Sequence, residues 1–198
     1  MIQRKYFFDS VRAALFSGSM TQGQVDGMSI LLDRAEQEGV DDRHLAYILA
    51  TTFHETAQTM APIAEYGKGK GMKYGVPAGP YNQIYYGRGF VQLTWFDNYQ
   101  KMQTILGSRW GDRDIVQTPD SAMDLDIATD VIFYGMLAGS FTGVGMPKYI
   151  TIQNPTTDTT DFYNCRKVVN GLDCATQIQG YAQKFANALV HAQRREVA

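Results

Sequence analysis

Apolar residues recur at helical spacing in the segment that begins at Asp41 or Asp42. Positions i, i+3, i+4, i+7 and i+8 lie on one face of a helix, and a helix with such a stripe buries it in the core. The stripe consists here of Leu45, Ile48, Leu49, Thr52 and Phe53. The pattern therefore predicts a helix with one buried face, ending close to Thr56.

Other segments have a helical pattern, and their positions suggest a mainly α chain. These segments are residues 3–16, 21–39, 96–107, 118–137, 159–171 and 176–194. Thr21 is suited to cap the start of its helix, and Gly39 to end it. Thr118 and Pro119 form a good N-cap and first-turn pair, ahead of one long helix or two abutting ones. The segment 159–171 ends in an Asn-Gly pair, which stops helices.

The helical pattern breaks between about Glu65 and Tyr86, where glycines and prolines are frequent. A loop this long inside a compact domain is usually functional. Residues 90–95, FVQLTW, alternate well enough for a short strand or an extended segment. Since no repeat, linker or low-complexity tract interrupts the chain, we expect one domain over residues 1–198, without a separate binding module.

Composition excludes several classes of protein. Hydrophobic residues make up 44% of the 198 residues and charged residues 19%, which is typical of a globular chain. The formal net charge is −2 and no block of Lys and Arg is present, so we predict no binding to nucleic acid. No run approaches the roughly 20 apolar residues of a membrane span, and we predict no membrane insertion.

Two features concern the compartment in which the protein is made. Cys165 and Cys174 are too few for a disulfide framework and lack zinc-site spacing, so we expect two reduced thiols in the core rather than one local bridge. Asp9 and Arg12 interrupt the apolar core that a signal peptide would need. These features favour synthesis in the cytoplasm without a signal peptide.

Glu55 is the first candidate for chemistry. It follows Ile48 by seven residues, so on a helix the two lie within about 20° of each other, and Glu55 projects from the buried face. Desolvation and the negative end of the helix dipole both disfavour the ionised carboxylate, so a group that stays protonated near neutral pH is predicted. Such a group suits a general acid. The alternative is that the helix frays at Thr56 and Glu55 simply reaches water.

The His54-Glu55 pair also invites a metalloprotease interpretation. Zincins place two His residues one turn apart with Glu as the base, but position 58 is Gln. With three His residues in the chain, a His-based zinc site is improbable, and we predict neither a metal nor an organic cofactor. His54 is expected to orient its neighbour or to fill the core.

Glu65, at the entry to the glycine-rich loop, is the second candidate. It would serve as a base on water from the face opposite the acid, or would simply be solvated. Glycines at 67, 69 and 71 are similar to a phosphate-binding loop, but no G-x4-G-K-[ST] is present. We interpret these glycines as flexibility that lets the loop approach an extended ligand.

Three motifs together carry a family resemblance. FHET at 53–56, YYGRGFVQLTW at 85–95 and VVNG at 168–171 resemble the glycoside hydrolase family 19 chitinases and related phage and bacterial endolysins. Their order and spacing cover roughly residues 45–185. The resemblance implies a lysozyme-like, mainly α fold with little β-structure, in which two lobes surround a central cleft. It also implies inverting hydrolysis of β-1,4-linked N-acetylhexosamine polymers.

The resemblance also implies roles for individual residues. By motif position Glu55 is the general acid and Glu65 the general base, while Thr94 replaces a family Ser that helps to hold the attacking water. Arg88 would serve structure or hold a carboxylate. The residues expected to bind the glycan are His54, Tyr85, Tyr86, Gln92, Trp95, Asn98 and Asn170.

Departures from the family favour one substrate. An Arg often follows VVNG in the family, but this chain has Gln177 and Gln179 near that place. The cysteines, carbohydrate-binding module and signal peptide of plant chitinases are missing. We therefore expect a monomeric endolysin that acts on peptidoglycan after release through a membrane lesion. A chitinase and a catalytically silent glycan-binding relative are the alternatives.

Overall fold

The structure is a computed structural model that describes residues 1–193. The helices and strands are α1 (Arg4–Leu15), α2 (Gln22–Glu38), α3 (Asp42–Glu55), β1 (Ile63–Ala64), β2 (Arg88–Gly89), α4 (Phe96–Leu106), α5 (Leu125–Ala138), α6 (Phe162–Cys165) and α7 (Ala175–Gln193). Short 3-10 helices cover Gly107–Arg109, Pro119–Met123, Met146–Lys148 and Arg166–Val168. The chain is thus mainly α, as predicted.

The chain divides into two compact units. The first unit comprises Met1–Met60 and Tyr134–Ala198, and the second unit comprises Ala61–Phe133. Helix α5 begins in the second unit and ends in the first. None of the described helices combines the length and apolar character that a membrane span needs. That two lobes surround a cleft remains a prediction.

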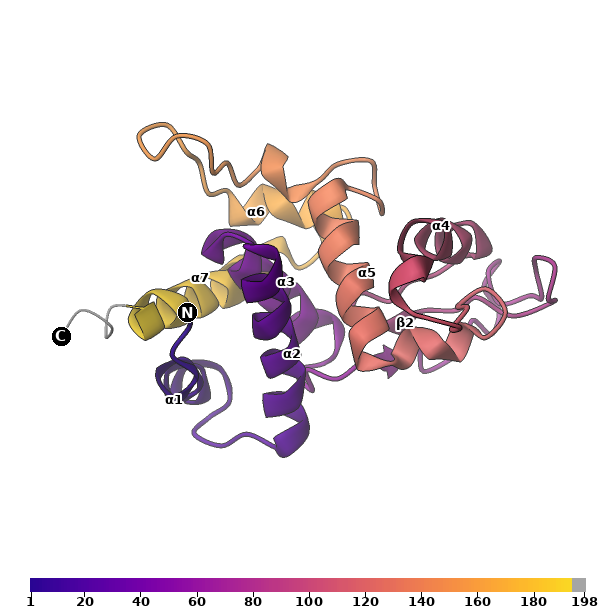
Figure 1. Cartoon of the computed structure of the whole chain (residues 1–198), viewed down its shortest axis with the longest axis horizontal. Helices are drawn as coiled ribbons and strands as arrows, with labels where there is room; N and C mark the ends of the chain where they lie inside the picture. The colour runs from indigo at the N-terminus through magenta and orange to yellow at the C-terminus, as the bar shows by residue number, and fades with distance from the viewer. Residues whose placement is uncertain (194–198) are drawn as a thin grey trace. The chain divides into compact units, whose positions relative to one another are not determined.

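Helix α3 is the centre of the first unit. All its residues from His44 to Phe53 are buried, so the helix is covered on every side rather than along one stripe. Helix α7 packs against both α3 and α1 (Figure 1). The predicted caps are present, because the Asp41 side chain accepts from the Arg43 N–H and Thr21 forms a capping box with Gln24.

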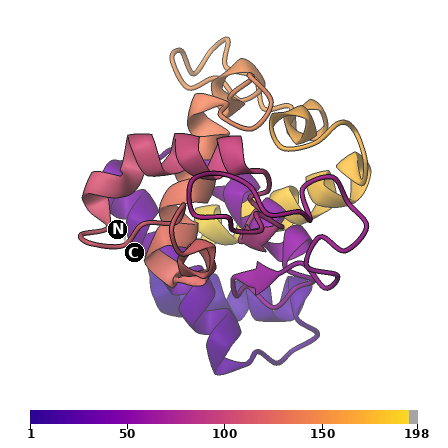
Figure 2. The same cartoon turned by 90° about the vertical axis from the view of Figure 1, so that its right-hand side faces the viewer.

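The second unit is built around a two-stranded antiparallel sheet. Ile63 pairs with Gly89 and Ala64 with Arg88, at the two ends of the long loop that the sequence predicted. Figure 2 shows this loop, most of which is drawn as a coil. Tyr85, Phe90 and Tyr99 are among the fully or almost fully buried aromatic residues of the unit.

Two segments differ from the predicted elements. Residues 90–92 form a turn instead of a strand, because Gln92 takes a positive φ of 55° and Leu93 returns to bond with Arg88. Residues 159–171 contain only the short helix α6 and the 3-10 helix that follows it. The 118–137 segment is two abutting elements, a 3-10 helix and α5, and the Thr118 side chain makes no capping hydrogen bond.

Gly27 allows the segment after α3 to approach α2. A Cβ at this position would lie 1.7 Å from the Met60 carbonyl oxygen, so Gly27→Ala must displace backbone. We expect it to lower the free energy of unfolding by about 2 kcal/mol, measured by urea denaturation. At Gly23 in the same helix, an added Cβ meets nothing within 4 Å. Gly23→Ala is therefore expected to leave the free energy of unfolding undiminished. Equal stability of the two variants would contradict this close approach.

Candidate functional site

Glu55 is the last residue of α3 in the first unit. Its side chain is only 17% exposed and its Oε1 accepts a hydrogen bond of 2.6 Å from Nη1 of Arg166. Helix α3 ends at Glu55, as in the alternative in which the helix frays at Thr56. The Glu55 carboxylate nevertheless points toward Arg166 and is hydrogen-bonded to it. Glu55 Oε2 has no hydrogen bond within residues 1–193.

Arg166 is a functional candidate that the sequence did not reveal. Its side chain is 3% exposed, and its Nε donates to the Asp173 carbonyl over 3.0 Å, which fixes the guanidinium beside Glu55. Arg166 thus brings a positive charge to the Glu55 carboxylate.

We expect Arg166→Met to lower the free energy of unfolding by about 3 kcal/mol, because it leaves Glu55 mostly buried without its partner. Urea denaturation measures the loss. The matched control is Lys167→Met at the exposed neighbour, which we expect to stay within about 0.5 kcal/mol of the parent. Adding Glu55→Gln to Arg166→Met should reduce the loss, since the unpaired charge is gone. An Arg166→Met protein as stable as the parent would show that the pair contributes nothing.

Glu65 directly follows β1 in the second unit. Its Oε1 accepts from the Tyr74 hydroxyl over 3.0 Å and its Oε2 accepts from the Gly87 N–H over 3.2 Å. The backbone is held as well, because the Glu65 N–H donates to the Gly87 carbonyl over 2.7 Å. Both carboxylate oxygens are therefore oriented by the fold, which a simply solvated side chain would not require.

Gly87 of the YYGRG motif has a steric reason to be glycine. A Cβ at Gly87 would lie 2.7 Å from Oε1 of Gln92, whose Nε2 donates to the Ile63 carbonyl over 3.0 Å. The absence of a side chain thus lets Gln92 tie the motif to β1 while the Gly87 N–H reaches Glu65.

Tyr74 connects Glu65 to exposed aromatic surface. Burial, and then the hydrogen bond to Glu65, raise the pKa of Tyr74, so the phenol remains the donor at neutral pH. The Tyr74 ring packs edge-on against Trp95 with centroids 5.4 Å apart. Trp95 is 47% exposed, and Tyr66 and Tyr81 of the same loop are also exposed. Tyr74 was missed because nothing in its glycine-rich surroundings predicted a fixed position.

The QLTW segment, residues 92–95, has an unusual backbone. Both Gln92 and Trp95 have positive φ, 55° and 74°, a region that costs energy for residues other than glycine and is frequent at functional sites. The Thr94 hydroxyl donates to the Gln92 carbonyl over 2.6 Å, and Asn98 Nδ2 donates to the Thr94 carbonyl over 2.8 Å. These bonds leave the oxygen atoms of the Thr94 and Asn98 side chains able to accept. Their contacts with glycan and water stay predictions.

Tyr85 is buried in the second unit, whereas the resemblance predicted that it contacts glycan. The residue is 1% exposed, its hydroxyl donates to the Val116 carbonyl over 2.8 Å and its ring packs on Tyr99. Tyr85 therefore serves the core of the second unit. Arg88 does hold a carboxylate, as one of its predicted roles required, since its Nε donates to Asp120 over 2.8 Å.

Tyr86 of the second unit is 8% exposed and its hydroxyl donates to Asp120. Two other predicted residues, His54 and Asn170, belong to the first unit. His54 is half-buried and its side chain makes no hydrogen bond within the described part of the chain, so it neither orients Glu55 through a hydrogen bond nor sits in the core. Asn170 is exposed, and its Oδ1 accepts from the Gly171 N–H over 2.9 Å. For both residues, a contact with glycan stays a prediction.

The cysteines are both free, and only one of them is in the core. Cys165 is buried, and this burial raises the pKa of its thiol. Cys174 is exposed, so the expectation of two core thiols is wrong for it. Among residues 1–193, no group of three His, Cys, Asp or Glu side chains is arranged to hold a metal ion.

Comparison with solved structures identifies the fold. The chain is similar to chitinase C from Streptomyces griseus HUT6037, with a TM-score of 0.61 and 19% sequence identity over 96% of this chain and 76% of that chain. The fold is chitinase-like. A mutant of chitinase C with one Glu replaced by Gln gives a TM-score of 0.52 and 21% identity, over 96% of this chain and 92% of that chain. No protein-family model and no curated protein sequence matches the chain.

The chitinase-like fold confirms the fold class that the motifs implied. It is a mainly α, lysozyme-like fold, shared with chitinase C at a sequence identity of 19%.

Proposed function

We propose that the chain is a glycoside hydrolase that cuts β-1,4 bonds of peptidoglycan between N-acetylmuramic acid and N-acetylglucosamine with inversion. The setting of Glu65 carries this proposal, because both of its oxygens are held and its donor Tyr74 packs against the exposed Trp95. The C–H groups of a sugar ring pack well on the electron-rich face of an indole. A fixed carboxylate close to such a face suits a base that acts beside a bound sugar.

In this proposal Glu55 donates the proton to the oxygen of the leaving sugar. Arg166 occupies Oε1, which leaves Oε2 to carry the proton and transfer it. As the proton leaves, the guanidinium 2.6 Å away stabilises the carboxylate that forms.

Glu65 takes a proton from the water that attacks the anomeric carbon. The hydrogen bonds from Tyr74 and Gly87 keep its two oxygens in place, so that little reorganisation is needed when the proton arrives. The Thr94 hydroxyl uses its hydrogen on the Gln92 carbonyl, and its lone pairs are free to accept from that water. Gln92, Asn98, Asn170 and Trp95 hold the glycan.

Peptidoglycan is preferred as the substrate because of the endolysin resemblance of the motifs and because neither cysteine is in a disulfide. Hydrolysis of chitin is the second candidate. The fold shared with chitinase C favours it. Both polymers contain β-1,4-linked N-acetylglucosamine, so the chemistry derived for Glu55 and Glu65 applies to either.

Mass spectrometry of digested peptidoglycan separates these candidates. We expect fragments with N-acetylmuramic acid at the reducing end. Fragments ending in N-acetylglucosamine would indicate a glucosaminidase instead, and cut stem peptides would reject a glycosidase. Hydrolysis of soluble chitin oligomers without release of wall fragments would select the chitinase. Binding of the wall without any product would indicate a silent relative.

A further inference from the structure

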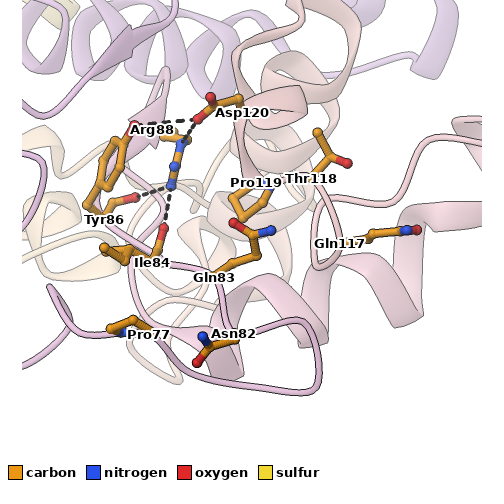
Figure 3. A pocket seen from close by; sticks show the side chains of 10 residues that line it. All are labelled: Pro77, Asn82, Gln83, Ile84, Tyr86, Arg88, Gln117, Thr118, Pro119 and Asp120. Atoms are coloured by element: carbon orange, nitrogen blue, oxygen red, sulfur yellow. Dashed lines mark hydrogen bonds and ion pairs between the residues drawn. The ribbon is translucent and has the colours of Figure 1, made fainter.

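The second unit contains a polar pocket that the proposed mechanism does not use. It has a volume of about 440 Å³, within the range of small-ligand sites. Figure 3 shows its lining, which consists of Pro77, Asn82, Gln83, Ile84, Tyr86, Arg88, Gln117, Thr118, Pro119 and Asp120. Neither of the residues that hydrogen-bond to Glu65 lines this pocket, and neither does Trp95.

Arg88 forms a rigid part of the pocket wall. Its side chain is 5% exposed, its Nη1 donates to the carbonyls of Ile84 and Tyr86 over 3.1 and 3.2 Å, and its guanidinium carbon lies 3.5 Å from the Tyr86 ring centroid. Nη2 has no acceptor within the described residues. This buried guanidinium therefore keeps donor capacity for a ligand.

The pocket carries no net charge. Arg88 is paired with Asp120, whose side chain is 78% exposed and whose Oδ1 also accepts from the Tyr86 hydroxyl over 3.4 Å. No other residue of the lining is charged at neutral pH. A charged ligand would find its counter-charge already paired, so the electrostatics favour a neutral ligand rich in polar groups.

The neutral polar groups of the lining are available. The side chains of Asn82, Gln83, Gln117 and Thr118 make no hydrogen bond within residues 1–193, and together they supply amide donors, amide acceptors and one hydroxyl. Pro77, Ile84 and Pro119 add apolar surface to the same lining (Figure 3). Amides together with small apolar side chains match a sugar that carries hydroxyl and acetamido groups on one side and C–H groups on another.

We infer that this pocket is a second carbohydrate site, which binds an N-acetylhexosamine residue of the glycan and is distinct from the residues that hold Glu65. The inference rests on the proposed function for the identity of the polymer. A second binding site for the glycan would keep the protein bound to an insoluble cell wall between hydrolysis events.

The test is an NMR titration of the full chain with N,N′-diacetylchitobiose, followed at assigned amides. We expect shifts at Gln83 and Thr118 in addition to those at Tyr74 and Trp95. The double variant Gln83→Leu with Thr118→Val is expected to weaken binding at the pocket about tenfold, since two hydrogen bonds are lost. Gln100→Leu, which removes an exposed amide of α4 outside the pocket, is the control and should bind as the parent does.

The outcomes distinguish the two proposals. Shifts at Tyr74 and Trp95 alone, with none at Gln83 and Thr118, would overturn the pocket inference and leave the proposed function standing. Shifts at the pocket in a protein that hydrolyses neither peptidoglycan nor chitin would support the pocket and reject the function. A pocket that responds to a soluble stem peptide and not to chitobiose would overturn its assignment to carbohydrate.

Discussion

Replacing Glu55 by Gln is expected to lower the rate of cell-wall hydrolysis by roughly 100- to 10,000-fold, the range that positioned proton transfer contributes. Gln keeps the shape of the side chain and an oxygen that can accept from Arg166, but it has no acidic proton. Clearance of a peptidoglycan suspension, calibrated by the release of reducing ends, measures the effect. Circular dichroism should show an unchanged fold.

Two further measurements make the assignment of Glu55 specific. An aryl glycoside whose phenol leaves without protonation should be hydrolysed by Glu55→Gln with a much smaller loss, because that substrate needs no acid. Glu38→Gln in α2 of the same unit is the matched control and should retain the parental rate. A Glu55→Gln protein that clears walls as fast as the parent would end the assignment of the acid.

The contrast between Glu55 and Arg166 shows what a local pattern can predict. Helix α3 follows from the spacing of its apolar residues and from Asp41 at its start, so the place of Glu55 at its end was predictable. Arg166 lies 111 residues away along the sequence, and adjacent Lys167 has the same charge but is exposed. No periodicity in so short a helix distinguishes the two, because tertiary packing decides which one is buried.

The QLTW segment shows a second limit. Its motif pointed to a functional site, but its alternating residues predicted an extended segment where the chain makes a turn. Positive φ values at Gln92 and Trp95 are unfavourable for their residue types, so propensity argues against the conformation observed. The conformation is stabilised by hydrogen bonds to other segments, such as the one from Gln92 to the Ile63 carbonyl. The local sequence pattern does not predict such long-range bonds.

Replacing Glu65 by Gln is expected to cause a loss comparable to that of Glu55→Gln, because an amide cannot take the proton of the attacking water. Glu65 is the only acidic residue between Glu55 and Asp97, so this stretch offers no carboxylate to substitute for it. The rate is measured on the same wall suspension. Tyr74→Phe is the graded comparison, because it removes one hydrogen bond to Oε1 and keeps the carboxylate, and we expect a loss of only about tenfold.

Chemical rescue then tests the role of Glu65 as a base rather than as a support of the fold. In Glu65→Ala, sodium azide can attack the anomeric carbon without giving up a proton, so azide is expected to restore turnover and to yield a glycosyl azide of inverted configuration. Azide should leave Glu55→Gln unimproved, because that variant lacks the acid and not the base. Near-full activity of Glu65→Gln without azide would place the base on a carboxylate outside residues 56–96, and the hydrogen bonds of Glu65 would then serve only to join β1 to the YYGRG motif.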